Sequence, residues 1–296
     1  MTTGSTKRII CSRAGIGTSA HIVQQQELLF THLVIDQPML IVVLQGAKTL
    51  RSQETTYQLR AGEAIVIAGG RSFDVINHLS PQGRYEACWL SWDSALIAEH
   101  ASVYDKASIQ SDRKVSTITQ ALPLRHIAPS FMDAINAAME AIRDQDGIPD
   151  AIAKHRLSEV LLWLSLHNAR LSCTEVRTLS GKLRLLLSSA PGKSWAAPDI
   201  AQQVAMSEAT LRRHLAAEDT TLSELLMDVR MSFALGLLQA TDKPIAQIAF
   251  ESGYESASRF AIRFRTRFGF PPTAIRGHRR RPNEQTERGT SYNNVI

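Results

Sequence analysis

The first third of the chain alternates short apolar segments with turns. The runs at 39–44 and 64–68 are apolar throughout, and turns containing glycine follow both. Further segments at 73–76 and 85–92 contain β-branched and aromatic residues. Short strands separated by regular turns predict a small β-sandwich or β-barrel over this part of the chain.

The next part of the chain switches to a helical period. Between residues 131 and 143, apolar side chains recur on one helical face, at Ile135, Ala138, Met139 and Ile142. A second helix is expected over 157–171, and its segment 160–164 is apolar almost all round. Such a helix must bury two faces. One face would pack on the strands, and the other would pack either on a second subunit or within the same subunit.

Residues 199–215 fit a first helix-turn-helix unit. Asp199 is a good N-cap for a short helix, and Ser207 can cap the next helix by accepting a backbone N–H bond. Leu211 and Leu215 would form the buried face of this second helix. A short buried helix, a tight turn and an arginine-bearing helix suit entry into a DNA major groove. The residues expected to contact DNA are Ser207, Ala209, Thr210, Arg212 and Arg213.

A second unit repeats this plan 48 residues later, where Ile248–Ala249 matches Ile200–Ala201. Gly253 would end the first helix, since glycine readily takes the left-handed conformation. Arg259, Arg263 and Arg267 recur at four-residue steps, on what we expect to be one outward face. The residues expected to contact DNA here are Ser256, Ser258, Arg259, Ile262 and Arg263.

An amphipathic helix over 222–238 would connect the two units. Its 17 residues span roughly 26 Å as a helix, and successive major-groove segments on one DNA face are about 34 Å apart. A generic helical bundle is the alternative interpretation of one such unit. Two units at a fixed separation, each with outward arginines, favour DNA binding instead.

The charge distribution also favours DNA binding. The net charge is +5, and residues 259–281 hold eight arginines and no acidic residue. Such a cluster is typical of a surface that contacts phosphates. The three cysteines are scattered, which favours a reducing compartment over a disulfide framework. No apolar run is long enough to cross a membrane and no secretory signal is visible, so we expect a cytoplasmic protein without membrane association.

Residues 194–276 resemble the DNA-binding domain of AraC-family transcription regulators. The resemblance rests on 244–249, Gly253–Tyr254, Phe260, Phe264, Phe268–Gly269, Pro271–Pro272 and Arg276. Two positions depart from the family pattern. The loop at Asp219–Thr220 lacks the usual glycine, and Ile262 stands where the family commonly has a polar or basic groove contact. Ile262 would meet a thymine methyl, or the helix would mainly hold phosphates. The resemblance implies a cupin-like sensor and dimerisation domain upstream.

These observations predict an α+β protein with four regions. Residues 1–180 would form a small cupin-like β-barrel with dimerisation helices, 181–197 a linker, 198–281 an all-α domain of two helix-turn-helix units, and 282–296 a disordered tail. The predicted function is sequence-specific regulation of transcription. The partners would be promoter double-stranded DNA, a small-molecule effector, a second copy of the chain and RNA polymerase. The effector would bind at Gln45, Lys48 and Arg71, and no cofactor or metal is expected.

Two other functions stay open on the sequence alone. The polar residues assigned to the effector pocket could equally be exposed, which leaves a ligand-independent dimeric regulator. A cupin-type enzyme would need clustered histidines and a carboxylate to hold a metal. The histidines of the first half, His21, His32, His78, His100 and His126, are isolated, which argues against this enzyme.

Overall fold

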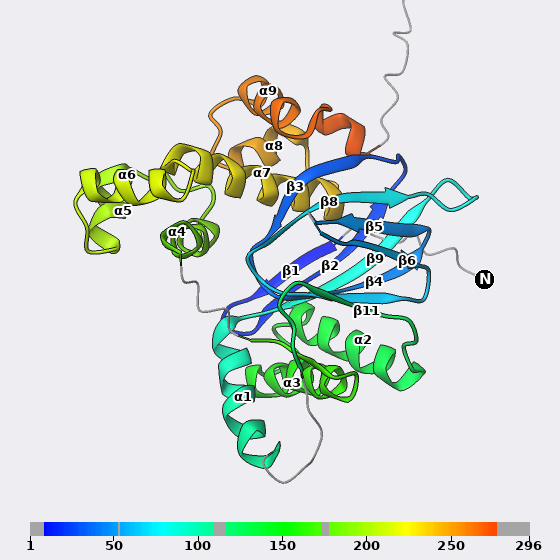
Figure 1. The fold of residues 1–296 in the computed structure, drawn as a ribbon. Coiled ribbons are helices and arrows are strands. Elements are labelled where there is room, and N and C mark those ends of the chain that lie inside the picture. Colours follow the sequence, from blue (N-terminus) through cyan, green and yellow to red (C-terminus); the bar gives the residue numbers. More distant parts are fainter. Residues whose placement is uncertain (1–8, 53, 109–115, 173–177, 277–296) are drawn as a thin grey trace, which may run out of the picture.

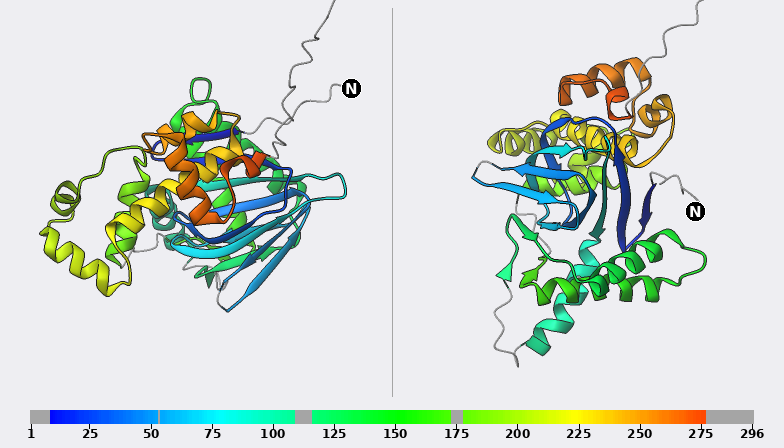
Figure 2. Two further views of the ribbon diagram at one scale, coloured as in Figure 1. Left: turned by 90° about the horizontal axis from the view of Figure 1, so that it is seen from above. Right: turned by 90° about the vertical axis from the view of Figure 1, so that its right-hand side faces the viewer.

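The computed structural model describes residues 9–52, 54–108, 116–172 and 178–276. These residues form a sheet-rich N-terminal half and a helical C-terminal part (Figure 1). Seen from the side (Figure 2, right), the sheets lie between the green helices α2 (Pro129–Arg143) and α3 (Asp150–Leu166) below and the yellow and orange helices α7 (Leu222–Ala240) and α9 (Ala257–Phe268) above. The predicted α+β class is confirmed.

The strands of the N-terminal half pair into two antiparallel sheets, ordered β1-β2-β9-β4-β7-β11 and β3-β8-β5-β6. The first sheet contains β1 (Ile9–Arg13), β2 (Gly17–Gln24), β9 (Tyr85–Trp92), β4 (Met39–Gln45), β7 (Ala64–Ile67) and β11 (Ala121–Leu124). The second contains β3 (Leu29–Ile35), β8 (Arg71–His78), β5 (Ala47–Arg51) and β6 (Thr56–Arg60). A small parallel pair joins β10 (Ser116–Thr117) to β12 (Ala169–Arg170).

The closed barrel expected from the sequence does not form. Among the described strands, each sheet keeps its own two edges, β1 and β11 in the larger sheet and β3 and β6 in the smaller one. No ladder of backbone hydrogen bonds joins one sheet to the other among these strands. The two sheets therefore make a sandwich, held together by side-chain packing rather than by continuous strand pairing.

The continuous apolar runs at 39–44 and 64–68 become β4 and β7 because both strands are buried on two faces. Leu40 and Val42 pack in a core with α2 and α3, whereas Ile41 and Val43 pack in a second core, between the sheets. Alternate side chains of a strand point to opposite faces, so a strand between two cores is apolar at every position.

Three helices accompany this half: α1 (Ser94–Ser108), α2 (Pro129–Arg143) and α3 (Asp150–Leu166). The second predicted helix was misplaced, since α3 begins seven residues earlier than 157 and ends at Leu166. Its segment 160–164 is covered within the subunit: Val160, Leu161 and Leu164 are buried, and Trp163 stacks on Phe131 with ring centroids 5.5 Å apart. The apolar character of this segment therefore needs no second subunit to explain it.

The C-terminal part contains α4 (Leu179–Ser188), α5 (Ala197–Gln203), α6 (Glu208–Ala217), α7 (Leu222–Ala240), α8 (Ile245–Glu251), α9 (Ala257–Phe268) and the 3₁₀ helix η1 (Pro272–Arg276). Residues 181–188 of the range expected to be a linker belong to α4, whereas residues 189–196 lie outside the helices and strands. Leu183 and Leu187 of α4 are buried against the first helix-turn-helix unit. The expected disordered tail, 282–296, and the arginines at 279–281 lie outside the described residues.

The two helix-turn-helix units belong to different cores. Helices α5 and α6 pack on α4 and the first turns of α7, in a core of their own. Helix α9, in contrast, shares one continuous core with the sandwich, in which Phe30 of β3 meets Phe268 edge-on at 6.3 Å. The second unit is therefore joined to the N-terminal half, while the first unit stands out from it (Figure 1).

Candidate nucleic-acid interface

The first candidate reading helix is α6. Ser207 caps it, because its Oγ accepts a bond from the Thr210 amide at 3.2 Å. Leu211 and Leu215 turn inward and are buried, as the sequence predicts. Ser207, Ala209, Arg212 and Arg213 are exposed and Thr210 is half-buried. Among the described residues, neither arginine makes an ion pair, so both guanidinium groups are available to a polyanion.

The turn of the first unit is strained where the second unit has glycine. Ala205 takes a φ of 53°, and Gly253 takes a φ of 78° at the matching position. Left-handed backbone is costly for an alanine and open to glycine. A Cβ at Gly253 would also lie 2.7 Å from Nη2 of Arg230, so the Arg230 side chain would have to shift to admit one.

The second candidate reading helix is α9, capped by Ser256, whose Oγ accepts from the Arg259 amide at 3.3 Å. Phe260, Phe264 and Phe268 point into the shared core. The five residues predicted to contact DNA are all exposed: Ser256, Ser258, Arg259, Ile262 and Arg263. Ile262 is 66% exposed, so its side chain is accessible to a ligand.

Arg267 does not lie on this outward face, contrary to the sequence-based expectation. Its side chain is 13% exposed and donates to Asp228 on α7 and to the carbonyl oxygens of Thr31 and His32. The reason is helical geometry: a four-residue step advances a side chain by about 40° beyond one full turn. Two steps from Arg259 therefore rotate Arg267 away from the DNA-facing side and onto the sandwich.

Helix α7 holds the two units at a fixed separation. It begins with a complete capping box, in which Thr221 and Glu224 satisfy each other's backbone amides. Its 19 residues span roughly 28 Å. Arg230 donates to the carbonyl oxygens of Pro191 and Lys193, and its guanidinium lies 5.8 Å from the Tyr254 ring. The arginine thereby links the segment after α4 to the turn of the second unit.

The three residues assigned to an effector pocket do not share one. Lys48 lies inside the sandwich, opposite Asn77 near the end of β8, and Gln45 bonds to Ser80 at 2.9 Å beside that end. Arg71 is at the other end of β8 and is exposed. Gln45 and Lys48 thus lie near the same end of β8 with different hydrogen-bond partners, and Arg71 belongs to another part of the surface.

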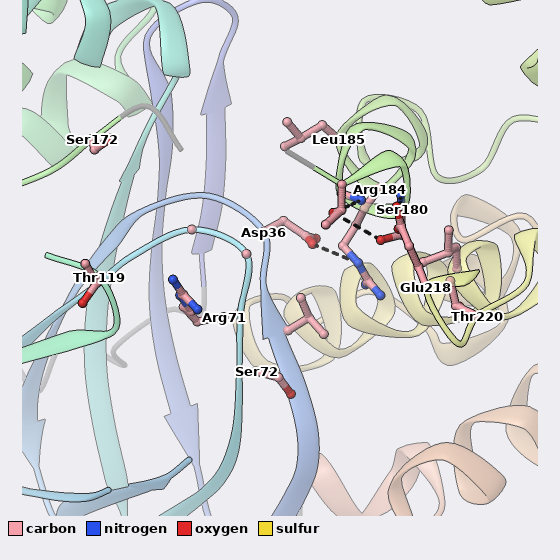
Figure 3. Close-up of a pocket in the computed structure, with 16 residues that line it drawn as sticks. Asp36, Arg71, Ser72, Thr119, Ser172, Ser180, Arg184, Leu185, Glu218 and Thr220 are labelled. Atoms are coloured by element: carbon pink, nitrogen blue, oxygen red, sulfur yellow. Dashed lines mark hydrogen bonds and ion pairs between the residues drawn. The ribbon is translucent and has the colours of Figure 1, made fainter. Parts of the chain in front are cut away.

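Arg71 lines a cleft of about 1040 Å³ between the sandwich and the first helix-turn-helix unit. Figure 3 shows its guanidinium on the sandwich side, with Arg184 of α4 across the opening. Asp36 and Arg184 form an ion pair of 3.7 Å, and burial raises the pKa of Asp36 to about 6. Sequence reasoning missed both residues, because an isolated aspartate after a strand and an arginine in a presumed linker carry no motif.

Two histidines of the N-terminal half pair with carboxylates. Among the described residues, histidines, cysteines and carboxylates form no group of three that could hold a metal ion. His21 instead pairs with Glu86 at 2.8 Å, and His78 pairs with Glu27 at 3.1 Å. None of the helices within the described ranges is long and apolar enough to cross a membrane.

Two family models match the chain. A helix-turn-helix domain model matches residues 200–278, and the ExsA N-terminal regulatory domain model matches residues 38–173. Together they cover most of both halves described above.

Curated relatives are similar over part of their length. The HTH-type transcriptional regulator YdeO of Escherichia coli strain K12 is 34% identical over 128 residues, which are 41% of this chain and 50% of YdeO. The urease operon transcriptional activator of Escherichia coli is 32% identical over 99 residues, 33% of each protein. The chain thus spans about half the length of YdeO and a third of the urease activator.

Solved structures of ToxT from Vibrio cholerae share the fold over both halves. ToxT bound to (E)-4-(8-methylnaphthalen-1-yl)but-3-enoic acid has a TM-score of 0.60 at 16% identity, covering 87% of this chain and 97% of ToxT. ToxT bound to an unsaturated fatty acid has a TM-score of 0.57, also at 16% identity, covering 92% and 95%. With two helix-turn-helix units joined by α7, the C-terminal part of this chain is a helix-turn-helix domain of the AraC type, and the N-terminal half matches the model of the ExsA N-terminal regulatory domain.

Proposed function

We propose that the chain is a sequence-specific DNA-binding transcription regulator. The observation that carries the proposal is the pair of capped helices, α6 and α9, each of which presents exposed arginines beside a buried apolar face. Arginine on a helix in the major groove can bond the O6 and N7 atoms of guanine together. In this proposal Arg212 and Arg213 contact bases in one major-groove segment. Arg259 and Arg263 contact bases or phosphates in the next segment.

We further propose that the N-terminal half senses a small effector, with the two-sheet sandwich in the place of the family's cupin-like barrel. ToxT, which shares the fold, is described as bound to an unsaturated fatty acid. The shared core of the sandwich and α9 supports coupling, since a ligand that moves the sandwich would also move the second unit. A homodimer, contact with RNA polymerase and a cytoplasmic location complete the proposal.

A ligand-independent regulator is the second candidate, and one observation favours it. The space between the sheets is filled by large buried side chains, including Phe30, Phe73 and Leu50, each at most 2% exposed. In that case the sandwich would act only as an assembly domain, and no small molecule would change the DNA affinity of the full chain.

The proposed function is tested by capture of genomic DNA fragments on the purified full chain, followed by sequencing. The proposal expects a small set of enriched fragments with a shared motif, and loss of that enrichment in a double variant, Arg212→Ala with Arg263→Ala. The control variant Lys182→Ala removes an exposed charge from α4 and should keep the motif. Uniform recovery of all fragments by the wild-type chain would contradict the proposal.

A further inference from the structure

A group of buried polar side chains lies inside the sandwich, away from the cleft and from both reading helices. Lys48 of β5 is 7% exposed, and its Nζ bonds to Oδ1 of Asn77 at 2.7 Å. Asn77 in turn donates to Oε1 of Gln24 at 2.9 Å, and both amides are almost completely buried. Two strands of the smaller sheet, β5 and β8, and one strand of the larger sheet, β2, thus bring polar residues to one end of an otherwise apolar interior.

Donors outnumber acceptors in this group. An ammonium group has three N–H donors, and the Lys48 ammonium has a single hydrogen-bond acceptor among the described residues, the amide oxygen of Asn77. Tyr85 of β9 is fully buried, and its hydroxyl has no hydrogen-bond partner in the described part of the chain. The Tyr85 ring lies 5.5 Å from the Lys48 ammonium. What this end of the sandwich lacks is therefore an acceptor.

Lys48 also has no carboxylate partner among the described residues, and its charge lies only against the face of the Tyr85 ring. Burial alone lowers the pKa of its ammonium to about 7, with no carboxylate contributing to the shift. An ammonium group buried without a counter-ion is costly to the folded state. A bound group with one negative charge would supply both the missing acceptor and the missing counter-charge.

The surface beside Lys48 offers a route for such a group. A hollow of about 550 Å³ is lined by Lys48, Thr49, His78, Arg60 and Arg125, among others. Its size suits a small molecule. Of the two arginines at its rim, Arg125 is paired with Glu63 at 2.8 Å and Arg60 makes no ion pair among the described residues, so the rim has a positive excess that attracts anions.

We propose that this end of the sandwich binds the carboxylate of a small organic acid, with Lys48 as the counter-ion and Tyr85 as a hydroxyl donor. A monocarboxylate matches the single buried charge of Lys48, whereas a phosphate dianion would bring a second negative charge that no other buried cation of this group offsets. The inference rests on the proposed function, because it names the effector class that the N-terminal half would sense. The ligand would join β5, β8 and β9, and β8 pairs with β3, the strand that holds Arg267.

Calorimetric titration of the full chain tests the site. The ligands are straight-chain monocarboxylates from acetate to octanoate, the primary amides of the same chain lengths, and inorganic phosphate. We expect at least one carboxylate to bind, and its amide and phosphate to bind at least tenfold more weakly. Lys48→Met should weaken carboxylate binding at least tenfold. Tyr85→Phe removes only the hydroxyl and should weaken it severalfold.

Matched controls make each outcome decisive. Lys154→Met removes an exposed lysine from α3 and should leave carboxylate binding unchanged. Absence of carboxylate binding to the wild-type chain, equal binding by the amides, preference for phosphate, or unchanged affinity in both Lys48→Met and Tyr85→Phe would each overturn the site. DNA affinity without any carboxylate is measured in parallel. If neither the wild-type chain nor any variant binds DNA, the regulator function is contradicted, and the carboxylate site is unaffected by that result.

Discussion

Nε of Arg267 on α9 donates to Oδ1 of Asp228 on α7 across 2.9 Å, and the same guanidinium reaches two carbonyl oxygens of β3. Asp228 also accepts from Arg184 on α4 at 3.4 Å. One carboxylate is thus shared by the helix that precedes the first DNA-binding unit and by the reading helix of the second. This arrangement fixes α9 against the sandwich and makes its position sensitive to changes in β3.

Removing Arg267 should loosen the second unit. Arg267→Met keeps the apolar stem and loses the ion pair and both carbonyl contacts, so we expect a loss of about 2 kcal/mol in the free energy of unfolding. Urea denaturation measures that loss, and hydrogen exchange at the β3 amides shows where it occurs. Arg265→Met is the control, because Arg265 is exposed on the same helix. Equal effects of the two substitutions would contradict the role given to Arg267.

Alanine substitutions at two glycines of the second unit distinguish two contributions to stability, the cost of left-handed backbone and the cost of steric contact. Gly253 and Gly269 have nearly equal φ values, 78° and 81°. A Cβ at Gly269 would meet nothing within 4 Å, whereas one at Gly253 would meet the Arg230 guanidinium. We expect Gly269→Ala to cost about 1 kcal/mol for left-handed backbone and Gly253→Ala to cost at least about 1 kcal/mol more. Similar thermal stabilities of the two variants would show that Arg230 moves aside freely.

The exposed Ile262 should read a base through apolar contact. Ile262→Ala removes most of that side chain without disturbing the core, so stability should stay within about 0.5 kcal/mol. Discrimination for a thymine at one position of the site should fall by about 1 kcal/mol. Competition binding with single-base variants of the selected site measures this loss. A uniform loss over all sequences would instead assign Ile262 to non-specific contact.

The buried Lys48 predicts a specific dependence of stability on pH. Its pKa falls from 10.5 to about 7 on folding, so the folded chain binds fewer protons at this group between these values. The contribution of Lys48 to stability should therefore rise as pH increases from 7 to 10, by at most about 1.4 kcal/mol per pH unit. Lys48→Met should be more stable than the wild type at pH 7, and this difference should shrink by pH 10. A difference independent of pH would contradict the burial of an ionisable amine.

The elements that could be predicted from the sequence are those whose pattern is local. The runs that became β4 and β7 were evident because a strand between two cores is apolar on both faces. The caps Ser207 and Ser256 could be placed because a hydroxyl before a helix satisfies an amide within the same turn. Both signals lie within a few residues of the feature that they predict.

The features that were missed depend on residues far apart in the chain. Whether the sheets close into a barrel depends on pairing between their edge strands, which the composition of a strand does not reveal. Lys48 and Arg71 are residue types that suit an effector pocket. Strand register, however, places Lys48 of β5 opposite Asn77, near the end of β8, whereas Arg71 is the first residue of β8. Arg267 was expected on the outward face of its helix because its four-residue spacing was considered without β3, whose contacting residues lie more than 230 positions earlier.

Selection of bound sequences from a random DNA pool by the full chain tests directly whether both units read DNA. The structure predicts an enriched site with two blocks, about 10–10.5 base pairs apart from centre to centre. Selection with Arg212→Ala should make one block degenerate and leave the other intact, and selection with Arg263→Ala should do the reverse. A single enriched block that neither substitution alters, or no enriched sequence at all, would show that the two units do not both read DNA.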